Sequence, residues 1–421
     1  MRQKIDNEHH RSGNRTQPSQ GPRSAMTEGM QYREFGKLDW RVSALGFGCM
    51  RLPTTDGKPL SKKINEKEAT RMIRHAIDKG VNYIDTAYPY HGGKSEVLVG
   101  KILTDGYREK VKLATKSPVW LIKKGKDFDT YLDEQLKRLK MDYVDFYLFH
   151  ALDRKAWRST ILKHNIIERA ESALEDGRIR HLGFSFHDEF SAFKEIVDGY
   201  DGWTFCQIQY NYMDVKNQAG TKGLKYAASK GLAVVVMEPL LGGRLASPPR
   251  PVRSILGSGR RKVPPVDMAL QWIWNQPEVS VVLSGMSTMG QVKGNLRSAS
   301  SSGIGSLGAR DLKLVDRVRK KYDELIPIRC TKCGYCMPCP NGVNIPRNFE
   351  VYNDGYIYNS MNLARTTYER FIPKDKRASA CIQCRKCEKK CPQGLKISEL
   401  MPVVHAALRK YAKGRPRSAA R

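Results

Sequence analysis

Short apolar runs alternate with amphipathic helical patterns over residues 31–325. Eight of the runs have the length and composition of strands: Ser43–Gly48, Val81–Asp85, Val111–Thr115, Tyr143–Leu148, His181–Ser185, Phe205–Gln209, Ala233–Met237 and Val279–Leu283. Parallel strands that are buried on both faces need helical crossovers. Eight such runs therefore predict an α/β protein whose main domain is a closed (β/α)8 TIM barrel. A doubly wound open sheet is the structural alternative.

The helical patterns between these runs place apolar residues on one face. In one pattern Asn65 is the predicted N-cap, Glu68 completes a capping box and Gly80 lies beyond the end. Its apolar face consists of Ala69, Met72, Ile73, Ala76 and Ile77. The face of a second pattern, after the third run, consists of Phe128, Leu132, Leu136 and Leu139. The three- and four-residue spacing predicts two helices that pack against the strands.

The pattern changes beyond residue 325. A helical stretch around 348–370 lies between two groups of cysteines, and an amphipathic helix follows. The apolar face of that helix consists of Ile397, Leu400, Met401, Val404 and Leu408. This pattern predicts a small, mostly helical second domain over residues 326–412. We expect residues 1–30 to be a disordered tail and residues 413–421 to be a basic tail.

The chain has 421 residues and a net charge of +30, from 73 Lys and Arg against 43 Asp and Glu. This charge favours anionic partners such as cofactor phosphates, acidic proteins or nucleic acid. The longest apolar stretch, Gly231–Leu241, is too short to span a membrane, and the first 30 residues hold no apolar signal segment. We expect a cytoplasmic protein without a membrane span, with Met26 and Met30 as alternative starts.

Eight of the ten cysteines stand in two groups, each of which ends on Cys-Pro: Cys330, Cys333, Cys336, Cys339 and Cys381, Cys384, Cys387, Cys391. The C-x2-C-x2-C spacing directs three thiolates at one cubic cluster. In two-cluster ferredoxins its fourth ligand is the cysteine before proline in the other group. We therefore predict two [4Fe–4S] clusters. One is assigned to Cys330, Cys333, Cys336 and Cys391, and the other to Cys381, Cys384, Cys387 and Cys339.

Zinc held by four cysteines is the alternative for these groups. Zinc sites usually combine two C-x2-C pairs across a longer loop, and Cys-Pro endings are not part of that pattern. The first group differs from the ferredoxin pattern in having two residues instead of three before its last cysteine. Two clusters in one small domain favour electron transfer over a purely structural role. The two remaining cysteines, Cys49 and Cys206, lie within strand-like runs and are expected to be core residues.

Polar residues stand at the ends of successive predicted strands. Asp85 ends the second run, Lys116 follows the third, His150 follows the fourth, and Tyr90 lies five residues after Asp85. In a barrel of this kind the chemistry takes place at the carboxyl ends of the strands. The four residues are therefore predicted to form one catalytic site.

The barrel segment resembles the aldo/keto reductase family. The resemblance rests on Gly46–Met50, Asp85–Tyr90, Ala114–Lys116, Asp145–His150, Gly183–Ser185, Gln207–Asn211, Glu238–Leu240 and Val281–Gly285, which follow one another in family order. With the cysteine groups, the whole chain is similar to the branch of that family that is fused to a C-terminal ferredoxin-like domain. The segment Cys330–Pro340 resembles the segment that binds the first cluster in that branch.

The resemblance implies carbonyl reduction with NADP or NAD as cofactor. Tyr90 would donate the proton, Lys116 would lower the pKa of Tyr90, Asp85 would hold Lys116, and His150 would orient the carbonyl. The cofactor-binding residues implied are Ser185, Gln207, Glu238, Leu240, Ser284, Gly285, Ser287, Gln291 and Asn295. Met237 replaces a tyrosine that stacks on the nicotinamide in many members. Lys293 is the nearest cation for a 2′-phosphate.

Two functions follow from these observations. The first is an NAD(P)H-dependent oxidoreductase that acts on a small carbonyl or quinone-like substrate and exchanges electrons with a redox protein through its clusters. The second is an iron–sulfur binding or electron-carrier protein whose inactive barrel contacts an acidic partner or nucleic acid. The complete set of four catalytic residues favours the first. Nucleic acid is disfavoured because the basic tails lack interleaved aromatic residues.

Overall fold

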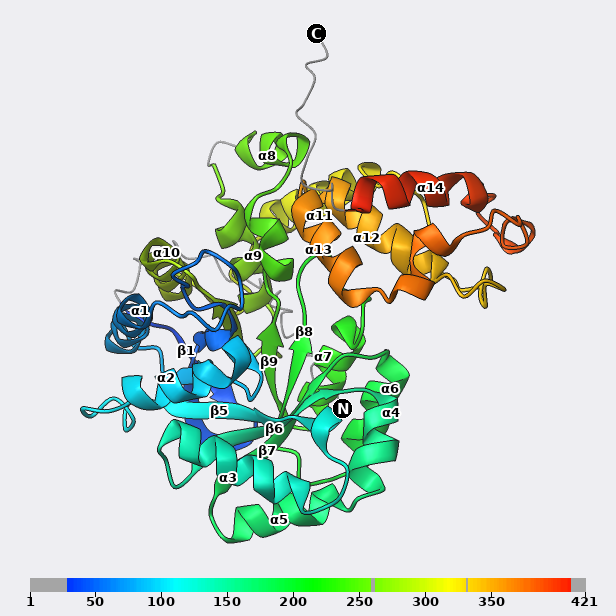
Figure 1. Ribbon diagram of the computed structural model, residues 1–421. Helices are drawn as coiled ribbons and strands as arrows, with labels where there is room; N and C mark the ends of the chain where they lie inside the picture. The colour runs from blue at the N-terminus through cyan, green and yellow to red at the C-terminus, as the bar shows by residue number, and fades with distance from the viewer. Residues whose placement is uncertain (1–28, 259–261, 331, 410–421) are drawn as a thin grey trace, which may run out of the picture.

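The computed structural model describes residues 29–258, 262–330 and 332–409, and its larger part is a closed barrel of eight parallel strands (Figure 1). The strands are β3 (Leu45–Gly48), β4 (Tyr83–Asp85), β5 (Lys112–Ser117), β6 (Val144–Leu152), β7 (Ile179–Phe186), β8 (Phe205–Gln209), β9 (Ala233–Met237) and β10 (Val281–Gly285). β10 pairs with β3 and closes the barrel. Each predicted run overlaps one of these strands, so the TIM barrel is confirmed and the open sheet is excluded.

An antiparallel hairpin precedes the barrel, formed by β1 (Tyr32–Phe35) and β2 (Leu38–Ser43). Phe35 is fully buried, and its ring lies 4.8 Å from Phe146 and 5.7 Å from Phe205, between centroids. Both phenylalanines belong to barrel strands, so the hairpin packs against the interior of the barrel. The sequence did not indicate this hairpin, because its apolar residues are too few to stand out from the barrel runs.

Helices connect and cover the strands. They are α1 (Glu66–Asp78), α2 (Lys94–Ile102), α3 (Asp127–Leu139), α4 (Arg154–Ala156), α5 (Ile166–Glu175), α6 (Phe190–Asp198), α7 (Gly220–Ser229), α8 (Arg250–Gly257), α9 (Pro265–Trp274), α10 (Met289–Ser300) and α11 (Ala309–Glu324). The apolar faces predicted for α1 and α3 are buried. Asn65 caps α1 by accepting from the backbone N–H of Glu68, as predicted. The capping box is incomplete, because the Glu68 carboxylate accepts from Arg71 instead.

The second domain contains α12 (Ile345–Ile357), α13 (Met361–Phe371) and α14 (Ile397–Leu408). The helical stretch expected around 348–370 is divided into two helices, because a turn with Asn359 at φ +48° separates α12 from α13. This turn lets the two helices pack on each other and on α14, around a core that includes Phe349, Tyr368 and Met401. The fold is therefore a TIM barrel followed by a small helical domain.

The two domains contact each other beside the carboxyl ends of β8 and β9 (Figure 1). The ring of Tyr322 in α11 lies 5.3 Å from that of Tyr358, which follows α12. Arg244, in the loop after β9, forms an ion pair with Asp354 of α12 at 2.9 Å and lies over the Tyr358 ring. The proposed tail 413–421 lies outside the described residues, as does the proposed N-terminal tail up to residue 28.

Candidate functional site

The structure brings the four predicted catalytic residues together at the carboxyl end of the barrel. Asp85 is the last residue of β4, Lys116 lies in β5, His150 lies in β6, and Tyr90 begins the short 3-10 helix Tyr90–Gly93. Asp85, Tyr90 and His150 line a cleft of about 600 Å³, and Lys116 lies buried beside them. The predicted set therefore shares one site.

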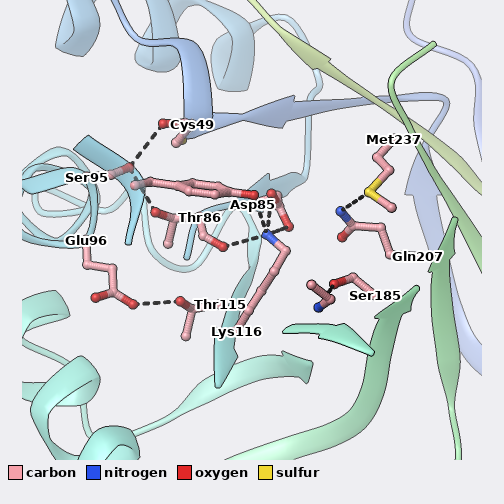
Figure 2. Close-up of polar contacts among 12 residues, drawn as sticks. Cys49, Asp85, Thr86, Ser95, Glu96, Thr115, Lys116, Ser185, Gln207 and Met237 are labelled. Carbon is pink, nitrogen blue, oxygen red and sulfur yellow. Dashed lines mark hydrogen bonds and ion pairs between the residues drawn. The ribbon is translucent and has the colours of Figure 1, made fainter. Parts of the chain in front are cut away.

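Lys116 links two of the other catalytic residues through its ammonium group. Its Nζ donates to both carboxylate oxygens of Asp85 at 2.7 Å and to the carbonyl oxygen of Thr86 at 2.7 Å (Figure 2). A longer contact of 3.3 Å joins Nζ to the Tyr90 hydroxyl. Asp85 and Thr86 thus hold the ammonium group next to the phenol.

Burial and neighbouring charges together set the protonation of Tyr90 and Lys116. Burial lowers the pKa of Lys116, but the Asp85 carboxylate and Tyr90 together raise it above its ordinary value, so Lys116 stays charged. Burial raises the pKa of Tyr90, and the charge of Lys116 offsets only part of that rise because Asp85 opposes it. Lys116 therefore lowers the pKa of Tyr90, as expected, but by less than burial raises it. Tyr90 carries its proton at neutral pH.

His150 is a neutral imidazole at the same site. Burial and the nearby charge of Lys116 lower the pKa of His150 well below its ordinary value. Its Nδ1 is buried and has no hydrogen-bond partner among the described residues. The His150 ring meets the Tyr90 ring edge-on at 6.0 Å and lies 5.1 Å from Trp120. A neutral, positioned imidazole can hydrogen-bond a substrate oxygen without competing for the proton of Tyr90.

A buried carboxylate, Glu96 of α2, supports the strand that carries Lys116. Glu96 accepts from the Thr115 hydroxyl at 2.7 Å (Figure 2) and from Arg138 of α3 at 3.0 Å. Gln135 of α3 also donates to Glu96 and, at 3.1 Å, to the carbonyl oxygen of Lys116. Sequence reasoning gave Glu96 no role, because a lone Glu in a helix is ordinarily exposed.

Ser185 and Gln207 line the cleft next to the catalytic residues. The Ser185 hydroxyl accepts from the backbone N–H of Ala151 at 2.7 Å, which leaves its own proton free to donate. Gln207 donates through Nε2 to the Met237 sulfur at 3.4 Å (Figure 2), while its buried Oε1 has no partner among the described residues. One free donor and one unpartnered acceptor fit a carboxamide such as that of nicotinamide.

The other residues predicted to bind the cofactor divide into two groups. Glu238, Leu240, Ser284 and Gly285 line the cleft. Asn295 is buried and donates to the Ser284 hydroxyl at 2.9 Å, so it positions that serine. Ser287 and Gln291 are not among the cleft-lining residues, and they bond each other through the Ser287 N–H and Gln291 Oε1 at 2.7 Å.

Arg51 is a cleft residue that sequence reasoning missed. A Cβ on Gly285 would lie 3.2 to 3.6 Å from carbon atoms of the Arg51 side chain, which therefore lies directly against Gly285. The carbonyl oxygen of Arg51 accepts from the Ser287 hydroxyl at 2.7 Å. More than 200 residues separate Arg51 from this loop in sequence, so only the barrel closure brings the cation there.

The second domain forms part of the cleft wall. Leu363 and Thr367 of α13 line the cleft together with Arg244 of the loop after β9. A second, polar cleft of about 650 Å³ lies between the domains. It reaches from Cys330 to Leu241, Arg244 and Thr367, three residues that also line the first cleft. The two clefts therefore share a wall.

The cysteines surround two neighbouring cavities in the second domain. Cavity A is lined by Cys330, Cys333, Cys336 and Cys391, and cavity B by Cys339, Cys381, Cys384 and Cys387. Each cavity thus combines three cysteines of one group with the last cysteine of the other, which is the predicted interleaved pairing. The first residues of α12 and α14, Ile345 and Ile397, line both cavities. The positive ends of two helix dipoles therefore lie beside both cavities.

The pairing of the thiols fits clusters better than zinc. Each cavity takes three cysteines of one group and the cysteine before proline of the other, which is the ligand set of two-cluster ferredoxins. Zinc sites usually combine two C-x2-C pairs across a longer loop. Cys49 and Cys206 are fully buried in the barrel core, as expected.

Comparison with known proteins agrees with this geometry. The profile of the aldo/keto reductase family matches residues 44–304, which is more than half of the chain. The chain belongs to the aldo/keto reductase family. A second profile, that of the 4Fe-4S dicluster domain, matches residues 329–395. This aldo/keto reductase is therefore an oxidoreductase with a C-terminal iron–sulfur domain.

Curated relatives match between about one third and two thirds of the chain. L-galactose dehydrogenase of Arabidopsis thaliana is 29% identical over 66% of this chain and 90% of its own length. The uncharacterized oxidoreductase YqkF of Bacillus subtilis is 27% identical over 65% of this chain and 92% of its own length. A probable aldo-keto reductase 1 of Glycine max is 30% identical, but that match covers only 36% of this chain and 44% of the relative.

Solved structures share the barrel fold. The holo form of aldo-keto reductase AKR11C1 from Bacillus halodurans superposes with a TM-score of 0.56 at 26% identity, over 69% of this chain and 96% of that one. An aldo-keto reductase from Klebsiella pneumoniae, solved with NADPH, gives 0.55 at 22% identity, over 69% and 95%. Among the described residues, no helix has the length and apolar character needed to cross a membrane.

Proposed function

We propose that this aldo/keto reductase reduces a small carbonyl or quinone-like compound with NADPH or NADH and exchanges electrons through two [4Fe–4S] clusters. The observation that carries the reductase function is the contact of Lys116 with both Asp85 and Tyr90 at the edge of the cleft. An inactive barrel would not need these contacts. We place the protein in the cytoplasm, where thiolates stay reduced.

The proposed reaction uses the protonation states described above. NAD(P)H, when bound, supplies a hydride to the carbonyl carbon. Tyr90 gives its proton to the carbonyl oxygen, and the ammonium group of Lys116 stabilises the phenolate that remains. Asp85 keeps Lys116 charged and in place, and neutral His150 orients the carbonyl through a hydrogen bond. Ser185 and Gln207 would hold the nicotinamide carboxamide.

Arg51 would bind the phosphates on the adenosine side of the cofactor. Its side chain lies against Gly285, in the loop assigned to those phosphates, whereas Lys293 is exposed on α10 and does not line the cleft. A guanidinium group is suited to a phosphate because it donates two parallel hydrogen bonds. Arg51 therefore favours NADPH as the cofactor.

The cluster assignment rests on the two cavities. Cys330, Cys333, Cys336 and Cys391 would hold one [4Fe–4S] cluster in cavity A, and Cys339, Cys381, Cys384 and Cys387 a second in cavity B. A hydride carries two electrons and each cluster passes one, so the pair of clusters matches one hydride. The wall shared by the two clefts supports exchange between the clusters and the barrel site.

The test is anaerobic reconstitution followed by mixing with NADPH or NADH. We expect about eight irons per chain, because each cube holds four. NADPH or NADH should be oxidised when an aldehyde, ketone or quinone is present. Without such a substrate, the reduced cofactor should bleach the absorbance of the clusters. Tightly bound zinc in place of iron would refute the cluster assignment. If the protein reduces carbonyl compounds but NADPH and NADH never reduce its clusters, only the proposed electron exchange between the clusters and the barrel site is refuted.

A further inference from the structure

The edge of cavity B faces solvent. Cys384 and Ile382 both line this cavity and are both exposed, Ile382 with 67% of its surface. In Figure 1, the loops that carry the cysteines form the end of the second domain that points away from the barrel. Another molecule can therefore approach a cluster in cavity B without entering the barrel.

The segment that carries this edge is rich in exposed cations. The cluster-edge patch consists of the exposed residues Ile382, Arg385, Lys386, Lys389, Lys390 and Lys396. The one carboxylate within segment 381–396 is that of Glu388, which accepts from the backbone N–H and the hydroxyl of Ser398 at 2.8 and 2.6 Å. Across the described residues, no carboxylate forms an ion pair with Lys386, Lys389 or Lys390. Their charge is therefore available to a partner.

We propose that the cluster-edge patch docks an acidic one-electron carrier protein, which exchanges electrons with the cluster in cavity B. This proposal rests on the proposed function, because it requires that cluster. In each encounter the reduced carrier is oxidised by one electron and the cluster is reduced by one electron, and no proton moves. Two encounters deliver two electrons, which make up one hydride together with one proton from solvent.

The arrangement of the patch fits this occupant. Two exposed residues of the patch, apolar Ile382 and cationic Arg385, both line cavity B, and exposed lysines follow Arg385 in the same segment. Protein interfaces likewise combine apolar contacts with a polar rim. Opposite charge accelerates the encounter with an acidic protein. A second copy of this chain would be repelled, because the chain carries a net charge of +30.

The experiment measures electron delivery by an acidic probe protein. Full-length protein with reconstituted clusters is mixed at low ionic strength with photoreduced plant-type [2Fe–2S] ferredoxin, and the cluster absorbance is followed. The test variant is K386E/K389E/K390E. The control variant, K216E/K222E/K225E, reverses three exposed lysines at and before α7, far from the cysteines in sequence. Iron content and the extent of reduction by dithionite show that the clusters of each variant are intact.

The parent and control should react at the same rate, and the test variant should react at least tenfold more slowly, since steering raises association rates by about 10- to 1,000-fold. The difference should vanish near 1 M salt, where charges are screened within about 3 Å. A test variant that reacts as fast as the parent at low salt overturns the proposal. Binding of duplex DNA is measured on the same proteins. If the test variant loses that binding but reacts with ferredoxin at the parent rate, the patch binds nucleic acid and the proposal is also overturned.

A further outcome separates this proposal from the function on which it rests. If ferredoxin reduces the clusters in a patch-dependent way but no carbonyl is reduced and no NADPH forms from NADP, the docking surface stands. The coupling between the clusters and the barrel site is then wrong.

Discussion

At the scale of single residues, the proton on Tyr90 is central to the proposed reaction. The Lys116 ammonium group lies 3.3 Å from the Tyr90 hydroxyl and is itself held by Asp85. Burial is the largest influence on the pKa of the phenol, and Asp85 opposes the lowering by Lys116, so the phenol rests protonated. The enzyme therefore meets its substrate with the proton in place.

Replacement of this hydroxyl gives the first prediction. Tyr90→Phe keeps the ring and removes the proton, so the rate of carbonyl reduction should fall by the ~10²- to 10⁴-fold that a positioned acid supplies. Steady-state kinetics with NADPH measure the loss. Cofactor affinity and iron content should not change, because the cluster cysteines lie in the other domain. A variant as fast as the parent would show that Tyr90 is not the acid.

The second prediction concerns pH. Reduction needs protonated Tyr90, whose pKa is raised, and neutral His150, whose pKa lies well below its ordinary value. The reactive form is lost only when pH rises through the raised pKa of Tyr90 or falls through the lowered pKa of His150. We therefore expect kcat/KM to be flat from about pH 6.5 to 10, given an ordinary tyrosine pKa of about 10. A bell-shaped profile centred near neutral pH would contradict these protonation states.

At the scale of elements, two helices and two loops build the cluster sites. α12 and α14 begin with Ile345 and Ile397, which separate cavity A from cavity B. The last cysteine of each sequence group lines the cavity of the other group: Cys391 lines cavity A and Cys339 lines cavity B. Each cavity therefore depends on both segments of the domain.

A pair of matched substitutions tests this arrangement. Cys391→Ser should damage the cluster in cavity A, although Cys391 belongs to the second sequence group. Cys339→Ser should damage the cluster in cavity B for the same reason. Iron analysis and electron paramagnetic resonance of the reduced proteins distinguish the two losses, since each variant is the other's control. If each variant loses the cluster of its own sequence group, the ligands do not interleave.

At the scale of the whole molecule, one ion pair joins the loop over the barrel cleft to the iron–sulfur domain. Arg244 and Asp354 lie 2.9 Å apart, with side chains 17% and 21% exposed. Burial raises the pKa of Asp354 to about 6, even though Arg244 acts to lower it. Arg244 is the nearest cation that stabilises the ionised carboxylate, and Arg347 adds to its effect.

Removal of this cation should have a pH-dependent cost. The raised pKa of Asp354 favours the folded state at low pH, and this contribution is lost as pH rises through about 6. Arg244→Met should lower the free energy of unfolding above this pH by a further amount of roughly 1.5–3 kcal/mol, the cost of deleting a charged hydrogen bond. The apparent unfolding temperature should therefore fall more at pH 7.5 than at pH 5. Asp354→Asn in the Arg244→Met background should restore most of the difference. An equal fall at both pH values would contradict the role of the pair.

Much of the protein is determined by its sequence. The eight barrel runs are recognisable because strands buried on both faces must be continuously apolar. Asp85, Lys116 and His150 could be grouped because parallel strands end on the same side of a barrel. The grouping of the cysteines follows from the short reach of a tight loop, which fixes three thiols around one volume.

The tertiary structure decided what depends on loop paths and burial. Arg51 reaches Gly285 only because β10 closes on β3, and Arg244 reaches Asp354 only because the loop after β9 turns through left-handed residues at Leu241 and Gly242. The raised pKa of Tyr90 could not be predicted, because the effects of burial and of two opposite charges differ in sign. Local patterns fix which residues stand at strand ends, whereas long-range packing fixes what surrounds them.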